Sequence, residues 1–436
     1  MRSTQKIYDV VGIGIGPFNL SLAAMLSRCP DIDAVFLDQK ACFEWHPGLL
    51  LDEVTIQVPF LADLVSMADP ASPFSYLQYL HKQGRLYRFY FLERFHIPRR
   101  EYNHYCQWVA GQLSCCRFGQ RVESISWDQH EQCFEVVARD MASDHLNRWL
   151  ARDLVLGVGT VPSMPTCFAR LCGENLFHAG EFLFRRERCR RSPHVTVVGS
   201  GQSGAEVFLA LLKEQDRYGY RLTWFTRSAG FFPMEYSKLG LEHFSPDYGH
   251  YFYSLSQVQR DRVLAGQDLL YKGISVKTIA DIYDLLYEHS IGGRTPDAHL
   301  LALVEIEDVV AMADESGYRL VCRHRHQDIT FTHDSQCVVL ATGYRTVIPT
   351  ALRGIHSLVR WDDRGRYQIQ QDYRLQLTAP ISNRIFVQNA ETHTHGVGAP
   401  DLGLGAHRNA VIINSLAGRE VYQVRHRNVF QQFGVK

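Results

Sequence analysis

The chain has 436 residues, of which 46% are hydrophobic and 21% charged, a composition typical of a folded globular protein rather than a disordered one. Its 46 Lys and Arg residues balance 46 Asp and Glu residues, so there is no overall basic excess that would favour nucleic acid or an anionic membrane. At about 150 residues per domain, the length predicts two to three domains.

The cysteines and the N-terminus both favour a cytoplasmic protein. The eleven cysteines are odd in number and include no C-x-x-C pair, which indicates reduced, mostly buried thiols. The first nine residues lack the charged and apolar regions of a signal peptide, and no apolar run reaches about 18 residues. We therefore expect no membrane partner.

A dinucleotide-binding unit is predicted at the start of the chain. An apolar strand at residues 8–12 runs into a glycine turn, a helix follows, and a second buried strand at 34–38 ends in an acid. Asp38 lies about 20 residues after the glycines, where an acid binds a ribose hydroxyl. The turn and the first helical residues contain Gly12, Gly14, Gly16, Pro17 and Asn19. Pro17 replaces the usual sixth-position glycine and is acceptable in a first helical turn.

A second unit of the same kind is predicted downstream. The strand at 194–198 leads into a complete G-x-G-x-x-G motif, then a helix and a strand at 222–226. That strand ends at Arg227 and not at an acid, which favours the 2′-phosphate of NADP, although a solvated arginine is the alternative. The motif residues are Gly199, Gly201, Gln202, Ser203 and Gly204.

Two nucleotide sites in one chain imply a bound flavin and a hydride-donating nicotinamide cofactor. We predict an α/β fold with two Rossmann-like domains. The FAD domain is expected at 1–190 and 336–436, and the NADPH domain at 191–335, with a small helical substrate region at about 231–290. Apolar strands at 154–160 and 337–344 are expected to mark the crossings between the domains.

Several motifs then occur in a characteristic order. They are Gly14-x-Gly16-Pro17-x-Asn19-Leu20, Phe43-x-Trp45-His46-Pro47-Gly48, Gln57 with Phe60-Leu61-x-Asp63-Leu64-Val65, the second glycine motif, Ala341-Thr342-Gly343-Tyr344, and Asn389 with His395-Gly396. This ordered set covers nearly the whole chain. It resembles the microbial amine N-hydroxylating flavoprotein monooxygenases of hydroxamate siderophore biosynthesis.

The resemblance implies the two cofactors and the reaction. NADPH would reduce FAD, the reduced flavin would bind O₂ as a C4a-hydroperoxide, and a neutral amine would take the distal oxygen. It places Trp45, His46 and Gln57 near the isoalloxazine and Arg99 close to it, with Gln57 and Arg99 as the catalytic pair. Leu402 and Gly403 belong to a flavin loop in which Gly403 replaces a serine, and Lys272 is expected near the NADP ribose.

Departures from the family pattern indicate the substrate. Members acting on lysine or ornithine carry a Lys where this chain has Ala62, and a polar residue where it has Leu241, so a substrate carboxylate would be left without a cation. Such a buried charge costs on the order of several kcal/mol. We therefore expect a diamine, cadaverine or putrescine. Asp63, Glu242 and Asp401 are candidates for its second ammonium, which the sequence does not rank.

Four other interpretations are open or disfavoured. A lysine or ornithine N-monooxygenase requires another cation to replace the missing Lys. A Baeyer–Villiger enzyme would need F-x-G-x-x-x-H, but Leu171 and a late His178 break that motif around Gly173. A disulfide reductase would need a redox cysteine pair. A nucleotide sensor would not need Trp45, His46 and Gln57.

Two further expectations concern metals and assembly. His393 and His395 have i, i+2 spacing with Glu391 nearby, but are expected to be structural, with no metal bound. The partners are then a small diamine and O₂, with no nucleic acid. By resemblance, the chain is expected to form a dimer or tetramer.

Overall fold

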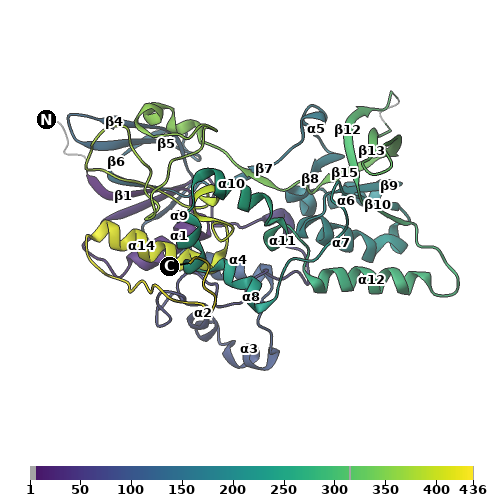
Figure 1. Ribbon diagram of the computed structural model, residues 1–436, viewed down its shortest axis with the longest axis horizontal. Helices are drawn as coiled ribbons and strands as arrows, with labels where there is room; N and C mark the ends of the chain where they lie inside the picture. The colour runs from purple at the N-terminus through teal and green to yellow at the C-terminus, as the bar shows by residue number, and fades with distance from the viewer. Residues whose placement is uncertain (1–5, 314–315, 436) are drawn as a thin grey trace.

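The computed structural model describes residues 6–313 and 316–435, so the first five residues and the last residue of the expected FAD segments lie outside the described part. It has two α/β lobes (Figure 1). Two short antiparallel strands, β7 (Thr160–Pro162) and β16 (Tyr344–Thr346), run between the lobes. This pair is where the chain crosses, as the two apolar strands before it predicted.

The first lobe is built on a seven-stranded sheet of order β3-β2-β1-β6-β5-β4, with β17 beside the end of β6. Strands β1, β2, β3, β6 and β17 are parallel, and β4 to β6 form an antiparallel meander. The strands are β1 (Ile7–Ile13), β2 (Ala34–Asp38), β3 (Cys116–Phe118), β4 (Gln120–Asp128), β5 (Cys133–Asp140), β6 (Leu146–Leu156) and β17 (Ile385–Val387).

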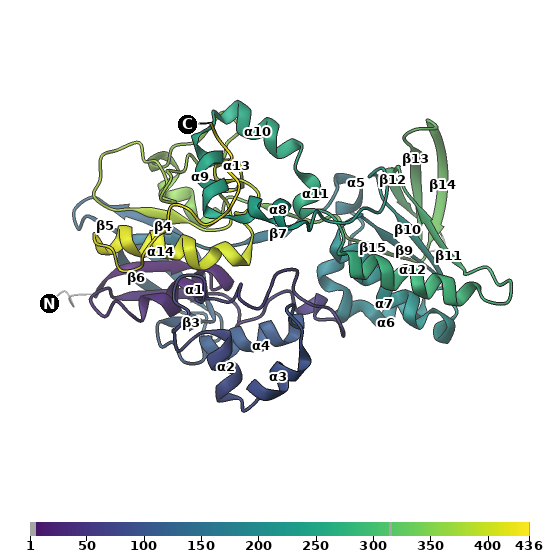
Figure 2. The same cartoon turned by 60° about the horizontal axis from the view of Figure 1, so that its bottom comes forward.

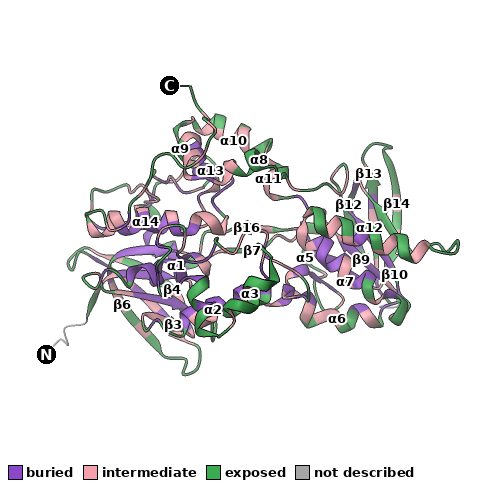
Figure 3. Ribbon diagram, turned by 90° about the horizontal axis from the view of Figure 1, so that it is seen from below, coloured by how far each residue is buried: buried purple, intermediate pink, exposed green. Residues whose placement is uncertain are grey.

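Two apolar cores cover the faces of this sheet. One lies under α1 (Pro17–Leu26), α4 (Arg99–Ala110) and α14 (Gly405–Ala417), with α2 (Tyr76–Lys82) beside them. The other lies under the 3-10 segment η4 (Thr350–Leu358). Helix α3 (Leu86–Leu92) has no buried residue and is largely exposed (Figure 3), at the lower edge of the view in Figure 1. Because α14 packs against α1, distant parts of the sequence meet beside the first glycine turn.

The second lobe has a five-stranded parallel sheet of order β11-β10-β9-β15-β8. Its strands are β8 (Leu176–His178), β9 (His194–Val198), β10 (Arg221–Phe225), β11 (Ala298–Leu301) and β15 (Cys337–Leu340). One apolar core of this lobe is built from three helices, α6 (Phe182–Arg191), α7 (Gln202–Tyr218) and α12 (Val276–Ser290). A second apolar core lies against a three-stranded sheet and includes α5 (Thr166–Ala169). The strands of that sheet are β12 (Val304–Ala311), β13 (Tyr318–His324) and β14 (Ile329–Ser335).

The expected boundaries of the inserted segment need correction. Residues 191–335 were expected to form it, but β8 and β15 lie outside that range and pair with each other in the second sheet. The reason is that β15 fills the place between β8 and β9, so the chain leaves the sheet only after residue 340. The sheet of the second lobe therefore extends from β8 to β15.

The helical region expected at 231–290 is divided between the lobes. Helix α12 packs on α7 of the second lobe. The preceding short elements pack around α13 (Thr392–His395) of the first lobe, with their own small apolar core (Figure 2). These elements are α8 (Lys238–Leu241), η3 (Glu242–Phe244), α9 (Pro246–Ser254), α10 (Gln257–Ala265) and α11 (Asp268–Tyr271).

Two findings bear on the surroundings of the chain. None of the helices in residues 6–313 and 316–435 combines the length and apolar character that a membrane span requires. All eleven cysteines are free, and six of them are buried.

Candidate active site

The first glycine turn joins β1 to α1 and is shaped for close approach. Gly14 has φ +86°, and a Cβ there would lie 2.5 Å from the carbonyl oxygen of Gly157. A Cβ on Gly16, by contrast, would meet no atom within 4 Å. Pro17 follows as the first residue of α1. The open space at Gly16, beside a helix N-terminus, fits the pyrophosphate of a dinucleotide.

The side chain of Asn19 stabilises this turn by hydrogen bonds. Its side chain is fully buried, and its amide nitrogen donates a 2.8 Å hydrogen bond to the carbonyl oxygen of Gly14. Its amide oxygen accepts one from Gln388, just after β17, also at 2.8 Å. The turn is therefore held by residues from both ends of the chain.

Asp38 ends β2 beside the turn, as predicted. One carboxylate oxygen accepts the N–H of Ile15 at 2.7 Å and the other that of Lys40 at 2.9 Å. Each oxygen keeps a second lone pair, so the carboxylate can still accept a ribose hydroxyl.

Trp45 and His46 lie next to the crossing strands. His46 has φ +49° and precedes the 3-10 turn η1 (Pro47–Leu49). Its ring packs edge-on against Tyr344 of β16, which also contacts His178, and Trp45 packs edge-on against Tyr102. Burial, with the Arg99 guanidinium adding to it, lowers the pKa of His46 to about 4, so its imidazole is neutral at pH 7.

The second glycine turn joins β9 to α7. Gly199 has φ +130°, and a Cβ there would lie 2.1 Å from the carbonyl oxygen of Ala341. Ser200 makes a 2.9 Å hydrogen bond to Ser228, which brings the segment after β10 against this turn. Arg227 in that segment is exposed and has no hydrogen bond or ion pair within the described ranges, so it is available for a phosphate.

Lys272 lies at the other side of this turn. A Cβ on Gly201 would be 3.6 Å from its carbonyl oxygen, but its ammonium pairs with Asp268 at 2.8 Å. The backbone of Lys272 therefore lies close to the second glycine turn. Contact between its side chain and a ribose stays a prediction.

Arg99 joins the two lobes instead of standing free. Its guanidinium makes a bidentate pair with Glu206 of α7, at 2.8 and 2.9 Å, and also donates to the carbonyl oxygen of Leu49 at 2.9 Å. Both side chains are nearly inaccessible. Glu206 also accepts a 2.9 Å hydrogen bond from Gln202 of the glycine motif. The structure therefore gives Arg99 a place between the lobes, and its contact with flavin stays a prediction.

Gln57 is likewise held across the molecule. The hydroxyl of Tyr236 donates to the carbonyl oxygen of Gln57 at 2.6 Å and lies 3.4 Å from its side-chain oxygen. Burial raises the pKa of Tyr236 to about 12, and the charge of Asp401 adds to this. Gln57, Tyr236 and Asp401 therefore belong to one neighbourhood.

Ala62 faces the loop that carries Asp401. A Cβ on Gly403 would lie 3.7 Å from the Cβ of Ala62 and 2.9 Å from a carboxylate oxygen of Asp401. Asp401 caps η5 (Leu402–Leu404) by accepting the N–H of Gly403 at 2.7 Å, and no side chain of the described residues donates to it. Burial raises its pKa to about 6, against the opposing effects of this N–H and of Arg408.

The cation that acts on Asp401 is already paired. Arg408 is almost fully buried, 2.9 Å from Glu391, and its guanidinium lies over the ring of Phe18. It is therefore not free to receive a substrate carboxylate. Asp401, whose carboxylate accepts backbone N–H groups and has no side-chain donor among the described residues, is the acid in this neighbourhood that can receive an ammonium.

Asp63 serves the fold of its own loop. Its two oxygens accept hydrogen bonds from the N–H groups of Val65, Ser66 and Tyr76, and from the Ser66 hydroxyl, at 2.6 to 2.9 Å. Four donors fill the lone pairs of a carboxylate. Its expected contact with a substrate ammonium is therefore corrected, because no acceptor capacity remains.

Glu242 accepts hydrogen bonds from residues near the end of the chain. Its two oxygens accept the N–H groups of Phe430 and Gln431 at 3.0 and 2.9 Å, and these hydrogen bonds lower its pKa. Leu241 precedes it at the end of α8 and is 40% exposed. Glu242 is thus a poor second candidate, and Leu241 as a pocket residue stays a prediction.

The histidines of α13 have partners of their own. His393 hydrogen-bonds to the carbonyl oxygen of Tyr367 at 2.8 Å, and His395 to that of Gln371 at 3.2 Å. Across the described residues, no group of three or more His, Cys, Asp or Glu side chains is placed to hold a metal.

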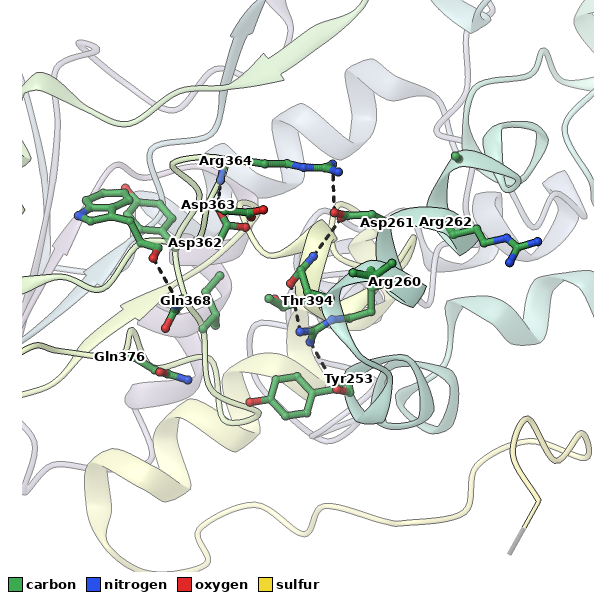
Figure 4. A pocket seen from close by; sticks show the side chains of 16 residues that line it. Tyr253, Arg260, Asp261, Arg262, Asp362, Asp363, Arg364, Gln368, Gln376 and Thr394 are labelled. Carbon is green, nitrogen blue, oxygen red and sulfur yellow. Dashed lines mark hydrogen bonds and ion pairs between the residues drawn. The ribbon is translucent and has the colours of Figure 1, made fainter.

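A separate cavity of about 920 Å³ lies between α10 and residues 361–376 (Figure 4). Among its charged lining residues, Asp261 pairs with Arg364, and it also pairs with Arg366 outside the lining. None of the site residues predicted from the sequence lines it. The cavity is therefore distinct from the two glycine turns.

Comparison with known proteins identifies the family. The family model described as L-lysine 6-monooxygenase/L-ornithine 5-monooxygenase matches residues 6–346. The chain belongs to this family. It is 46% identical to the rhizobactin siderophore biosynthesis protein RhbE of Rhizobium meliloti, over 98% of this chain and 95% of that one. It is 43% identical to a putrescine N-hydroxylase of Shewanella oneidensis, over 98% and 84% of the two chains.

A solved structure of the family is also close. The cadaverine monooxygenase DfoA of the desferrioxamine pathway of Erwinia amylovora, bound to FAD, has 42% sequence identity and a TM-score of 0.95, with 99% of both chains covered. The family resemblance and the two-nucleotide α/β fold predicted from the sequence are thereby confirmed.

Two residues of this N-monooxygenase site were missed by the sequence reasoning. Tyr236 is the hydrogen-bond partner of Gln57, and Glu206 is the ion-pair partner of Arg99. Glu206 sits two residues after the last motif glycine, and an acid on the apolar side of α7 is a weak signal of a buried ion pair. Tyr236 gave no signal, because its partner is 179 residues away.

Proposed function

We propose that the chain N-hydroxylates one amine of a short aliphatic diamine, cadaverine or putrescine, with FAD, NADPH and O₂, as an early step of hydroxamate siderophore biosynthesis. The observation that carries the substrate class is Asp401, a buried acid without a side-chain donor among the described residues, in the loop that faces Ala62, while the nearby cation Arg408 is already paired. The names of the diamine-oxidising relatives support the same substrate class. Lysine or ornithine oxidation is the less supported alternative.

The chain's two glycine turns would hold the cofactors. Residues 12–17 would cradle the FAD pyrophosphate, with Asp38 at the ribose and Trp45 and His46 on the flavin side. The second turn would take NADPH, with Arg227 at its 2′-phosphate. Bound FAD, once reduced by NADPH, supplies activated oxygen to the amine nitrogen.

The protein's task toward the substrate is to keep one end charged and the other neutral. Alkyl ammonium groups have pKa values of about 10, so the reacting amine must lose a proton before it attacks. The carboxylate of Asp401 would hold the distal ammonium. The apolar Ala62 and the neutral His46 present no anion that would keep the reacting amine protonated, and desolvation favours its neutral form.

A side-by-side assay tests the proposal. The full-length chain, loaded with FAD, is given NADPH and either cadaverine, putrescine, lysine or ornithine, and the hydroxylamine product is measured. We expect a diamine to have a kcat/KM at least about tenfold above both amino acids, which corresponds to one lost charge contact. Lysine or ornithine turnover equal to that of the diamines would contradict it.

The proposal also covers the cellular location and the oligomeric state of the enzyme. The free thiols, together with a requirement for NADPH, support a cytoplasmic location. The family resemblance supports a homo-oligomer, a dimer or a tetramer. Size-exclusion chromatography with light scattering tests the assembly.

A further inference from the structure

Residues 428–434, near the end of the chain, lie against the short helices of the first lobe, and we call this segment the strap. The backbone and side-chain amides of Asn428 donate to Asp247 at 3.1 and 2.8 Å, which ties the strap to α9. The N–H groups of Phe430 and Gln431 donate to Glu242 at the start of η3. The ring of Phe433 lies 5.0 Å from that of Tyr248.

One line of contacts leads from the strap to Asp401 through Glu242. Glu242 opens η3, whose last residue, Phe244, has its Cα 3.8 Å from where a Cβ on Gly398 would stand. The carbonyl oxygen of Gly398 accepts the N–H of Asp401 at 3.0 Å. Movement of η3 would therefore displace the turn that carries the Asp401 carboxylate.

A second line leads to the same loop through Phe433. Tyr248, which Phe433 covers, has a ring carbon 3.2 Å from where a Cβ on Gly396 would stand. Gly396 has φ +85° and begins the loop of residues 396–401. The Tyr248 and Phe252 rings also pack with buried Val397 of this loop. The strap is thus linked to the loop at two places, Gly396 and Gly398.

We infer that the strap positions the Asp401 loop for the distal ammonium of the substrate, so that the C-terminal residues determine diamine affinity and not hydride delivery from NADPH. The inference rests on the proposed function, because it takes Asp401 as the ammonium acceptor.

Removal of the strap tests this inference. A chain ending at Arg427 is compared with the full-length holoenzyme. We expect KM for cadaverine or putrescine to rise about tenfold, while the rate of flavin reduction by NADPH without diamine stays within about twofold, because only substrate binding is lost. A KM within about twofold of the full-length value would overturn the inference.

Two matched point variants remain informative if the shortened chain does not retain FAD. Phe433→Ala removes the ring that covers Tyr248, whereas Phe430→Ala makes the same chemical change at a side chain that is 94% exposed. We expect Phe433→Ala to raise the diamine KM and Phe430→Ala to leave it unchanged. Equal values for the two variants would overturn the inference.

A double-mutant cycle separates positioning from direct binding by Glu242. If Glu242 acts through the strap, Glu242→Gln raises KM in the full-length chain and has little further effect in the shortened one. An equal rise in both chains would show direct binding and overturn the inference. A full-length chain that hydroxylates no diamine would refute the proposed function itself, which distinguishes that failure from failure of the strap alone.

Discussion

Asp401 sits in a turn whose neighbours leave it little electrostatic competition. Arg408 is paired with Glu391, and burial keeps the phenols of Tyr236 and Tyr102 neutral by raising their pKa. The carboxylate is thus the group in this neighbourhood whose charge changes near physiological pH. In the proposed function, binding of the substrate ammonium depends on this one ionisation.

The pKa of Asp401, raised to about 6 by burial, predicts an acid limb in the activity. Above that pH the carboxylate is ionised and binds an ammonium, and below it the protonated form does not. The kcat/KM for a diamine should therefore fall as pH drops through about 6, because this ratio reports groups of the free enzyme. Asp401→Asn should raise KM and abolish this limb in a pH–rate profile. A variant that keeps the wild-type profile would contradict the assignment.

Ala62 offers a second test, in which charge and bulk are separated. Ala62→Lys places a cation near Asp401, and Ala62→Met adds a side chain of similar length without charge. We expect the Lys variant to lower diamine kcat/KM at least about tenfold below the Met variant, because like charges within a few ångströms repel in a desolvated site. Steady-state assays of both variants decide this. Equal kcat/KM values would show that only bulk matters at residue 62.

At the scale of the element, the turn between β1 and α1 contains two glycines with different constraints. Gly14 is required by its backbone, since φ is +86° and a Cβ would overlap Gly157. Gly16 has extended backbone and faces open space, so the protein itself would tolerate a methyl group there. Only a bound pyrophosphate requires its absence.

These two glycines predict different outcomes for the same substitution. Gly14→Ala should lower the melting temperature and lose FAD, because both strain and overlap oppose the folded turn. Gly16→Ala should keep the fold of the apoprotein and lose FAD affinity alone. Circular dichroism melting with flavin quantification measures both properties. A destabilised Gly16→Ala apoprotein would contradict this view of the turn.

The elements that the sequence predicted well are those with a local signal. Strand β2 coincides with the expected 34–38 because an apolar run ends in an acid. Helix α12 lies at the end of the helical region expected at about 231–290, and its apolar residues recur with helical period. The meander of β4 and β5 was not foreseen, since most of its residues are partly buried or exposed and its apolar pattern is weak. The hydrogen bonds that occupy the Asp63 carboxylate were not foreseen either, because the donor Tyr76 is 13 residues away.

At the scale of the whole molecule, two lobes must meet at a fixed geometry for hydride transfer. The buried Arg99–Glu206 pair, the Tyr236–Gln57 hydrogen bond and the exposed Lys213–Glu53 pair cross between the lobes. Of these, the buried pair is coupled to the second glycine motif through Gln202. It is therefore the contact expected to set the position of the nicotinamide.

Breaking this pair should slow the reduction of flavin. Glu206→Gln leaves the Arg99 charge buried without its partner, at a cost of about 3 kcal/mol to the joined lobes. Lys213→Ala breaks an exposed pair between the same lobes and should have little effect. Stopped-flow reduction by NADPH compares the two variants. Similar rates in both would show that the Arg99 pair does not position the lobes.

The order in which the two lobes can fold during synthesis follows from the way the first lobe is closed. Strand β17 lies beside β6, and Asn409 of α14 reaches the carbonyl oxygen of Phe18 and the hydroxyl of Ser21. A ribosome that has translated only as far as β15 has delivered every strand of the second sheet but not these closing pieces. The second lobe can therefore fold earlier in translation than the first lobe, which is closed only once β17 and α14 have been made.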